Sequence, residues 1–211
     1  MNQPIDRRSF LRRTTAYGSS LLLAPSLQGL IACSKDAPAA PHRGLGYGPM
    51  AQSSAVPELM IPPSFTVVRL SETTRPSTVN LGFVVPQAVD GMAAFPLPNG
   101  NIRLIRNHEI ADPATDALPI GSRARSYDPR ASGGTTSLEV RARPDGMREL
   151  VAEYVTLSGT HINCAGGPTP WGSWISCEET TEGPTHGRLK PHGYCFEVPV
   201  SATAETEPVP L

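Results

Sequence analysis

The sequence lacks the features that identify several large protein classes. It shows no long helical periodicity and no helical repeat, which argues against helix bundles and helical solenoids. Its most apolar stretch, residues 16–32, is interrupted by Gly18, Pro25 and Gly29, so we expect no stable membrane-spanning helix. The chain also has no Gly-x-Ser-x-Gly motif and no Cys-x-x-Cys pair, the patterns typical of many serine hydrolases and of zinc sites.

The balance of charge argues against a nucleic-acid-binding protein. The chain has 18 Lys and Arg residues against 19 Asp and Glu residues. The first 32 residues carry four of the arginines and one aspartate, so the remainder has 14 basic and 18 acidic residues and a net charge of −4. No basic patch interleaved with aromatic residues is visible. We therefore expect no nucleic-acid partner.

The first 33 residues have the pattern of an export signal. Arg7 and Arg8 are followed by Ser-Phe-Leu, which is the twin-arginine motif, and the weakly apolar stretch comes next. The run Leu-Ile-Ala-Cys ending at Cys33 is similar to a bacterial lipobox, which predicts cleavage before Cys33 and lipidation of its thiol. A basic arm that binds an acidic surface, and ordinary cleavage with an incidental cysteine, are the alternatives. The expected partner is the twin-arginine translocase. The expected location is periplasmic or at the cell surface, with the membrane contacted only through a lipid anchor.

The rest of the chain is predicted to be a tether followed by short strands. With 23 Pro and 19 Gly in the chain, residues 34–57 have the composition of a linker. In residues 58–211, Asn-Gly at 99–100 and Asp-Gly at 145–146 predict two hairpins. We expect a long loop at 110–134 and strands at 64–70, 92–97, 102–107, 135–143, 148–157, 171–177 and 194–200. The predicted class is all-β, and a sandwich, a jelly roll and a propeller all fit this spacing.

The segment from Asn163 to Glu179 is the strongest candidate for chemistry. Cys164 precedes a Gly-Gly-Pro-Thr-Pro turn, a short aromatic strand follows, and Glu178 and Glu179 end that strand. A thiolate near paired carboxylates suits a site for a softer and a harder cation. The two glutamates are neighbours on an extended chain, so at most one points straight into a given site. The alternatives are a small buried cysteine and a solvated strand end.

A second candidate segment lies at the end of the first predicted hairpin. Asn107, His108 and Glu109 follow a strand and together offer an amide oxygen, an imidazole and a carboxylate. From spacing alone, a polar strand end that makes turn hydrogen bonds is the favoured interpretation. The segment is therefore a weaker candidate than the one around Cys164.

Two other pairings of reactive side chains fit the sequence less directly. A serine nucleophile would need Ser158 or Ser173 beside a histidine and an orienting acid, and the missing nucleophile motif argues against it. Cys177 and Cys195 fall on two consecutive predicted strands, so they could face each other if those strands pair antiparallel. An oxidising compartment permits a disulfide between them, and two separate buried thiols are the alternative.

At these residues the sequence resembles the PhoX-type alkaline phosphatase family. The resemblance is carried by the arginine motif, by Asp90-Gly91-Met92, by residues 106–109 and above all by residues 160–179, and it covers roughly residues 60–200. It implies a six-bladed β-propeller whose axial site holds iron and calcium and hydrolyses phosphate monoesters. The expected partner is then a small phosphorylated substrate.

The resemblance also implies roles for individual residues. Cys164 would ligate iron. Glu179, together with Glu178, would supply carboxylate ligands, and Glu109 is a further candidate. Asn107 would be a neighbouring polar residue of the site. A six-bladed propeller needs about 24 strands and about seven are predicted here, so we expect an incomplete β-propeller made of the N-terminal blades, in a truncated chain. The alternative function is a non-catalytic, surface-anchored propeller that binds a ligand or partner.

Overall fold

The computed structural model describes residues 46–211, so Arg7, Arg8 and Cys33 lie outside the described residues. The chain divides into two compact units, Met1–Arg69 and Leu70–Leu211. In the first unit, β1 (Ala51–Gln52) and β2 (Met60–Ile61) form a short antiparallel pair. In the part of the chain that the structure covers, no helix has the length and apolar character needed to cross a membrane.

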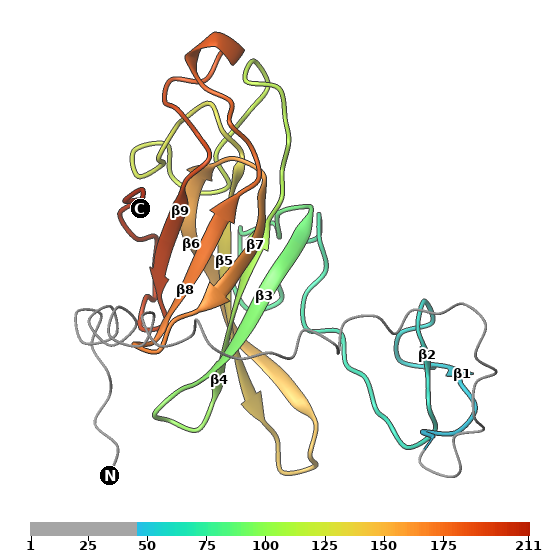
Figure 1. Cartoon of the computed structure of the whole chain (residues 1–211). Coiled ribbons are helices and arrows are strands. Elements are labelled where there is room, and N and C mark those ends of the chain that lie inside the picture. The colour runs from blue at the N-terminus through green and yellow to red at the C-terminus, as the bar shows by residue number, and fades with distance from the viewer. Residues whose placement is uncertain (1–45) are drawn as a thin grey trace, which may run out of the picture. The chain divides into compact units, whose positions relative to one another are not determined.

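The second unit contains two antiparallel sheets (Figure 1). The first sheet has the order β3-β4-β5-β6, formed by Val89–Pro96, Ile102–His108, Gly133–Ala142 and Arg148–Thr160. The second has the order β7-β8-β9, formed by Asn163–Pro168, Ser173–Glu178 and Cys195–Pro199. Among residues 46–211 the only helical element is the 3₁₀ turn η1 (Pro184–His186). The all-β class is therefore confirmed.

Both predicted hairpins are present, and glycine makes their turns. Leu97 and Asn101 close the β3-β4 turn with a backbone hydrogen bond, and Gly100 has a φ of 83°. Arg143 and Met147 close the β5-β6 turn in the same way. The strand order within each sheet equals the order in the chain, although β4 joins β5, and β8 joins β9, through long loops. The predicted loop at 110–134 is also confirmed up to Gly133, where β5 begins.

Two details of the predicted secondary structure are wrong. Residues 64–70 do not form a strand, because no neighbouring strand provides a hydrogen-bonded ladder and most of their side chains are exposed. Gly166 and Gly167 lie inside β7 rather than in a turn, and neither has a positive φ. Glycine is required at 166 because a Cβ there would collide with the Trp174 ring and with the carbonyl oxygen of Ile175 on β8.

The main hydrophobic core draws side chains from both sheets. Its buried members are Phe95, Ile105, Tyr127, Leu157, Trp174, Phe196 and Val198. Fully burying a side chain of this size contributes about 1.5–3 kcal/mol, so this cluster is the main source of stability for the pair of sheets. A second, smaller cluster of Leu138, Val140 and Leu150 lies in the first sheet alone.

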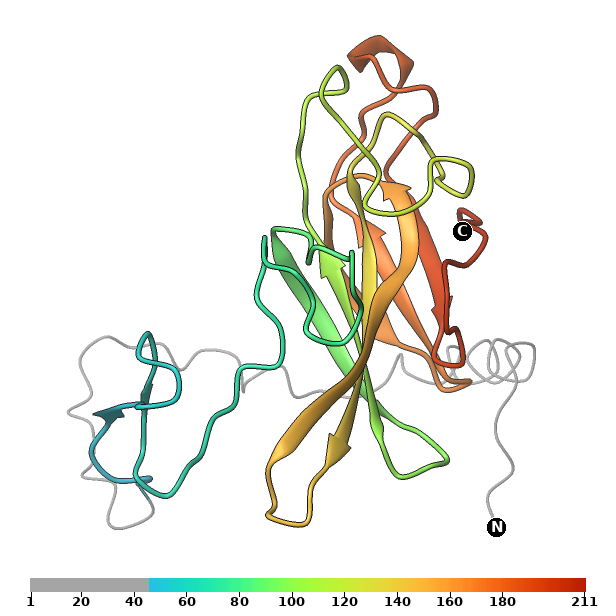
Figure 2. The same ribbon diagram turned by 180° about the vertical axis from the view of Figure 1, so that it is seen from behind.

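The long loops gather at one end of the sheets. Figures 1 and 2 show the loops of residues 109–132 and 179–194 together at the end opposite the hairpin turns at 97–101 and 143–147. Backbone hydrogen bonds tie the strand ends there: Ile162 donates to Ile110 over 3.3 Å, and Glu179 donates to Ile162 over 2.8 Å. The start of β3 and the end of β4 are joined similarly, by Glu109 N–H to the Ala88 carbonyl. Side chains that are distant in the sequence therefore meet at this end.

Candidate metal centre

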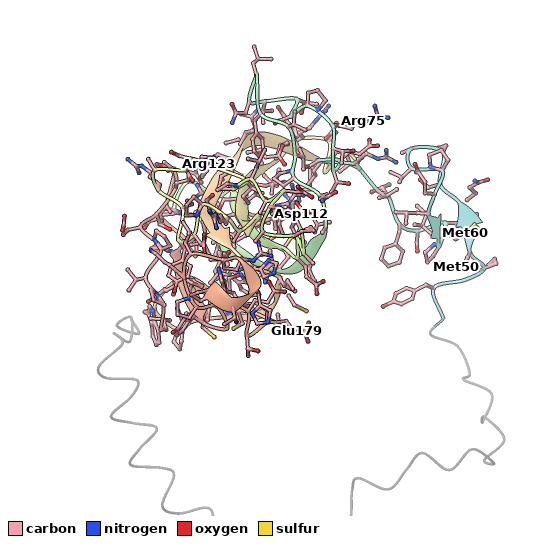
Figure 3. All side chains as sticks on the ribbon, turned by 90° about the horizontal axis from the view of Figure 1, so that it is seen from above. Met50, Met60, Arg75, Asp112, Arg123 and Glu179 are labelled. Atoms are coloured by element: carbon pink, nitrogen blue, oxygen red, sulfur yellow. The ribbon has the colours of Figure 1, made fainter. Side chains whose placement is uncertain are left out.

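Four potential metal ligands meet at the loop end of the sheets. One donor atom each from Asp90, Glu109 and Cys164 lies within 4.8 Å of the others. Asp90 belongs to β3, Glu109 follows β4, and Cys164 belongs to β7. The carboxylate of Glu179, which follows β8, lies close enough to the Cys164 thiol to raise its pKa. We refer to Asp90, Glu109, Cys164 and Glu179 as the acidic–thiol cluster. Figure 3 looks onto this end of the molecule, with Glu179 labelled.

The crowding of acids changes the proton affinity of the cluster. The hydrogen bond to Glu179, followed by burial and the proximity of Asp90 and Glu109, raises the pKa of the Cys164 thiol to about 12. The hydrogen bond to Asp90 and repulsion between the carboxylates raise the pKa of Glu109. In both cases the anionic form is disfavoured because other acidic groups surround it. A bound cation would reverse that preference.

Among the described residues, no cationic side chain forms an ion pair with the acidic–thiol cluster. Among residues 46–211, the ion pairs of Lys, Arg and His involve other carboxylates, and none involves Asp90, Glu109 or Glu179. A thiolate is a ligand that iron accepts, and carboxylate oxygens suit harder cations such as calcium. The residues that meet here therefore fit a metal-binding site in both charge and ligand type.

Asn107 positions Cys164 rather than contributing to the cluster. Its buried side-chain amide donates to the carbonyl oxygens of Cys164 (2.8 Å) and Ala165 (3.0 Å). Its Oδ1 accepts hydrogen bonds from the Trp174 indole (2.9 Å) and the Ser176 hydroxyl (2.8 Å). All of its donors and its acceptor are thus engaged in the protein, and the result is a fixed position for the backbone that carries the thiol.

His108 is likewise engaged within the protein. Its Nδ1 donates to the Gln87 carbonyl oxygen, and its Nε2 accepts from the Thr136 hydroxyl, both over 2.8 Å. Burial lowers the pKa of this histidine to about 4. The imidazole is therefore neutral at physiological pH and holds the end of β4 in place.

Glu178 points away from the acidic–thiol cluster into the interior. Its Oε1 accepts from the His161 N–H (2.8 Å) and from His192 Nδ1 (2.7 Å). Its Oε2 accepts from the N–H groups of Gly193 (2.7 Å) and Tyr194 (3.1 Å). The opposite orientations of Glu178 and Glu179 follow from the alternation of side chains along an extended chain. The structure thus brings Glu179 to the cluster and does not bring Glu178 there.

Asp128 completes this interior arrangement from the long loop. It accepts hydrogen bonds from the backbone N–H groups of Arg130, Leu189 and Lys190, and its Oδ2 lies 3.4 Å from His192 Nε2. Burial alone would raise the pKa of this carboxyl, but these hydrogen bonds lower it. We refer to Asp128, Glu178 and His192 as the buried carboxylate network. It anchors the two loops that surround the candidate site.

The structure also shows how the two candidate serines and the pair of strand cysteines are placed. Among the described residues, Ser158 and Ser173 make no hydrogen bond to a histidine: Ser158 Oγ accepts from Gly121, and Ser173 Oγ donates to Glu197. Cys177 and Cys195 are directly paired across β8 and β9, so the prediction that they face each other is confirmed. Both are free thiols, with a distance of 3.0 Å between their sulfur atoms.

Sequence reasoning missed one member of the cluster and most of the buried network. Asp90 was recognised only as part of a motif, although an acidic residue where β3 begins, opposite the Asn-His-Glu segment, was an available indication. Asp128 and His192 gave no local indication, because they lie in loops whose path depends on tertiary contacts. The hydrogen bonds of Asp128 span about sixty residues of sequence, from 128 to 189, 190 and 192.

Comparison with known proteins agrees with this geometry. No curated protein and no solved structure matches the chain. The family model of the alkaline phosphatase PhoX matches residues 45–211, which include both sheets and every member of the acidic–thiol cluster. The resemblance carried by the Cys164 segment is confirmed, and the chain belongs to the PhoX alkaline phosphatase family.

Proposed function

We propose that this chain is an exported, metal-dependent phosphatase-like protein that hydrolyses phosphate monoesters, or the N-terminal part of one, with iron and calcium as its cations. The observation that carries the proposal is the acidic–thiol cluster, in which one thiol and three carboxylates meet without a cationic partner among the described residues. Family membership supports the reaction class. Iron and calcium are what the family resemblance implies, and the ligand types are compatible with both, sulfur with oxygen for the first and oxygen alone for the second.

The roles of the residues follow from where they lie. Cys164 and Glu179, whose side chains are neighbours, would hold the iron. Asp90 and Glu109 would share the cations from the opposite side of the cluster. A Lewis-acidic cation held there supplies positive charge that polarises the phosphoryl group of the substrate. Asn107 keeps the Cys164 backbone in place, so the thiol does not need to reorganise during binding.

The arrangement of the sheets supports a propeller as the finer description of the fold. The first strands of the two sheets, β3 and β7, approach so closely that a Cβ on Gly91 would lie 2.6 Å from the Cys164 carbonyl oxygen. A bridge between Phe196 and Pro210 continues the second sheet beyond β9. Successive four-stranded meanders whose first strands adjoin are what two consecutive blades would provide. The acidic–thiol cluster would then lie beside the axis of the propeller.

Export rests on the sequence of residues 1–33. The twin-arginine pair Arg7-Arg8 would direct a folded, metal-loaded protein across the membrane, and Cys33 would carry a lipid. Incorporation of labelled palmitate in a bacterial host, lost in Cys33→Ser, tests the lipid anchor. Secretion that survives replacement of both arginines by lysine would contradict the export route.

The activity is tested on the full chain purified after native export. We expect iron and calcium by elemental analysis, and turnover of p-nitrophenyl phosphate that chelation of calcium abolishes. Cys164→Ser and Glu179→Gln should each remove turnover and lower the iron content. Glu149→Gln, an exposed change at the start of β6, is the matched control and should retain both.

The same experiment can favour the alternative function. If the exported protein contains no metal, or holds metal through the cluster but turns over no phosphate ester, the phosphatase assignment is wrong. The chain would then be a surface-anchored binding protein that keeps the family scaffold.

A further inference from the structure

A second potential binding site lies beside the acidic–thiol cluster. A cavity of about 720 Å³ opens among the loops at the same end of the sheets. Its volume falls in the range typical of small-molecule sites, about 300–1,000 Å³. The walls are lined largely by small residues, namely Ala111, Pro113, Ala114, Ala117, Pro129 and Gly187. Because these side chains are short, the loops can lie close together without filling the space.

Arg188 holds the walls of this cavity in position. Its guanidinium donates to the carbonyl oxygen of Asp112 over 2.6 Å and to the carbonyl oxygen of Arg130. Its Nε donates to the Glu182 carboxylate over 3.1 Å. The Arg188 side chain is only 2% exposed, so one buried cation ties together three separate loop segments. A cavity fixed in this way is formed before a ligand arrives, which reduces the cost of binding.

The charged groups on the walls favour an anion. Three arginines, Arg123, Arg130 and Arg188, face two acids, Asp112 and Glu182. Glu182 is paired with Arg188, so the cationic excess comes from the exposed arginines. Arg130 uses one guanidinium donor for the Gly187 carbonyl oxygen, and its other side-chain donors have no partner within residues 46–211. Arg123 makes no side-chain hydrogen bond or ion pair within residues 46–211, and its guanidinium donors are available.

The segment that presents Arg123 is itself anchored. Ser122 N–H donates to both oxygens of the Glu205 carboxylate, at 2.9 and 3.1 Å, and the Arg123 carbonyl accepts from the Ser126 hydroxyl. The backbone position of Arg123 is therefore defined although its side chain is exposed. Figure 3 labels Arg123 and Asp112 on the loop end of the molecule.

We propose that this cavity binds the anionic group of a small ligand, a phosphate or a carboxylate, through Arg123 and Arg130. A guanidinium presents several donors in a planar fork that matches both anions. The site is distinct from the acidic–thiol cluster, whose own side chains repel anions. It is also close to it: Asp112 follows Glu109, and Glu182 follows Glu179, by three residues, a span of at most about 11 Å.

The test uses the full chain after removal of metal with a chelating resin, so that phosphate cannot bind at the acidic–thiol cluster. Inorganic phosphate and tricarballylate are titrated separately by calorimetry at constant ionic strength. We expect saturable binding at one site, weakened roughly fivefold or more in Arg123→Gln, the loss expected for a charge-assisted hydrogen bond. The tighter of the two ligands identifies the preferred anion.

Two further variants make the result specific. Arg125→Gln is the matched control, because Arg125 is a neighbouring exposed arginine that donates to the Glu205 carbonyl and does not line the cavity. Its affinity should equal that of the unchanged protein. Ala114→Trp fills the cavity and should abolish binding, with the fold checked by thermal unfolding. Absence of saturable binding, or an equal loss in Arg125→Gln, or unchanged affinity in both Arg123→Gln and Ala114→Trp, would overturn the proposal.

Discussion

The acidic–thiol cluster and the buried carboxylate network begin at adjacent residues, Glu179 and Glu178, yet they are opposites in chemistry. In the network, each carboxylate oxygen of Glu178 accepts two hydrogen bonds, and an imidazole lies between two acids. In the cluster, acids and a thiol face one another, and the hydrogen bonds among them raise proton affinity. In the network, hydrogen-bond donors balance the carboxylate charge, whereas in the cluster the acids face other acids.

This difference separates structure from function at the end of one strand. A buried charge that is fully hydrogen-bonded stabilises the fold only in its native surroundings, and removing a partner is costly. A group of like charges near the surface carries a penalty that a cation relieves. We therefore expect changes in the network to affect stability, and changes in the cluster to affect metal binding. Four predictions test this division.

The largest effect is expected from Glu178→Gln. In the native protein both oxygens of Glu178 accept hydrogen bonds. The glutamine replaces one of these oxygens with an NH₂ group, which cannot accept, so at least two hydrogen bonds are lost in a buried site. We expect the free energy of unfolding to fall by about 3–5 kcal/mol, as for breaking a buried ion pair. Glu179→Gln is the matched control and should change it by less than about 0.5 kcal/mol in metal-free protein. Urea unfolding measures both, and equal losses would contradict the division.

Cation binding gives the next largest effect. Metal-free protein should gain about 2.7 kcal/mol in unfolding free energy when calcium, or ferrous iron under anaerobic conditions, exceeds its dissociation constant a hundredfold. Thermal unfolding with and without the cation measures this gain. Cys164→Ser should remove it for iron, and Glu178→Gln, where still folded, should retain it. A gain that survives in Cys164→Ser with Glu179→Gln would place the cation elsewhere.

Asn107 is buried, like the carboxylate network, but it holds the backbone of Cys164, a residue of the acidic–thiol cluster. Asn107→Ser removes the donors that fix the Cys164 and Ala165 carbonyls. We expect iron affinity to fall roughly tenfold, the lower end of the effect of groups that orient metal ligands. Competition with a coloured chelator measures the affinity. Ser176→Ala, which removes a different partner of the same amide, serves as the control and should change iron affinity by a smaller factor.

The features that depend on local sequence pattern were predicted correctly. The all-β class, both hairpins and the facing cysteines follow from turn residues and alternation. Local pattern failed at Gly166, where close approach of Trp174, not a turn, requires glycine. It also could not show that Glu178 turns inward, because its partners His161, His192 and Gly193 are brought together only by the loops. A pair of adjacent glutamates has the same appearance in sequence whichever one faces the interior.

The smallest effect is a difference in thiol reactivity with pH. In metal-free protein the pKa of both Cys164 and Cys177 is raised to about 12. The largest cause for Cys164 is the neighbouring Glu179, whereas the largest cause for Cys177 is burial. Iodoacetamide attacks the thiolate, so both thiols should react slowly at pH 8 and about tenfold faster per pH unit above it. Because the folded thiol keeps its proton above the ordinary pKa of about 8.5, its contribution to stability is complete below that pH and is lost as the pH rises towards 12.

Glu179→Gln should accelerate labelling of Cys164 alone, as read by peptide mass. Equal acceleration at Cys177 would show that the substitution loosens the sheet instead of relieving the charge on the thiol.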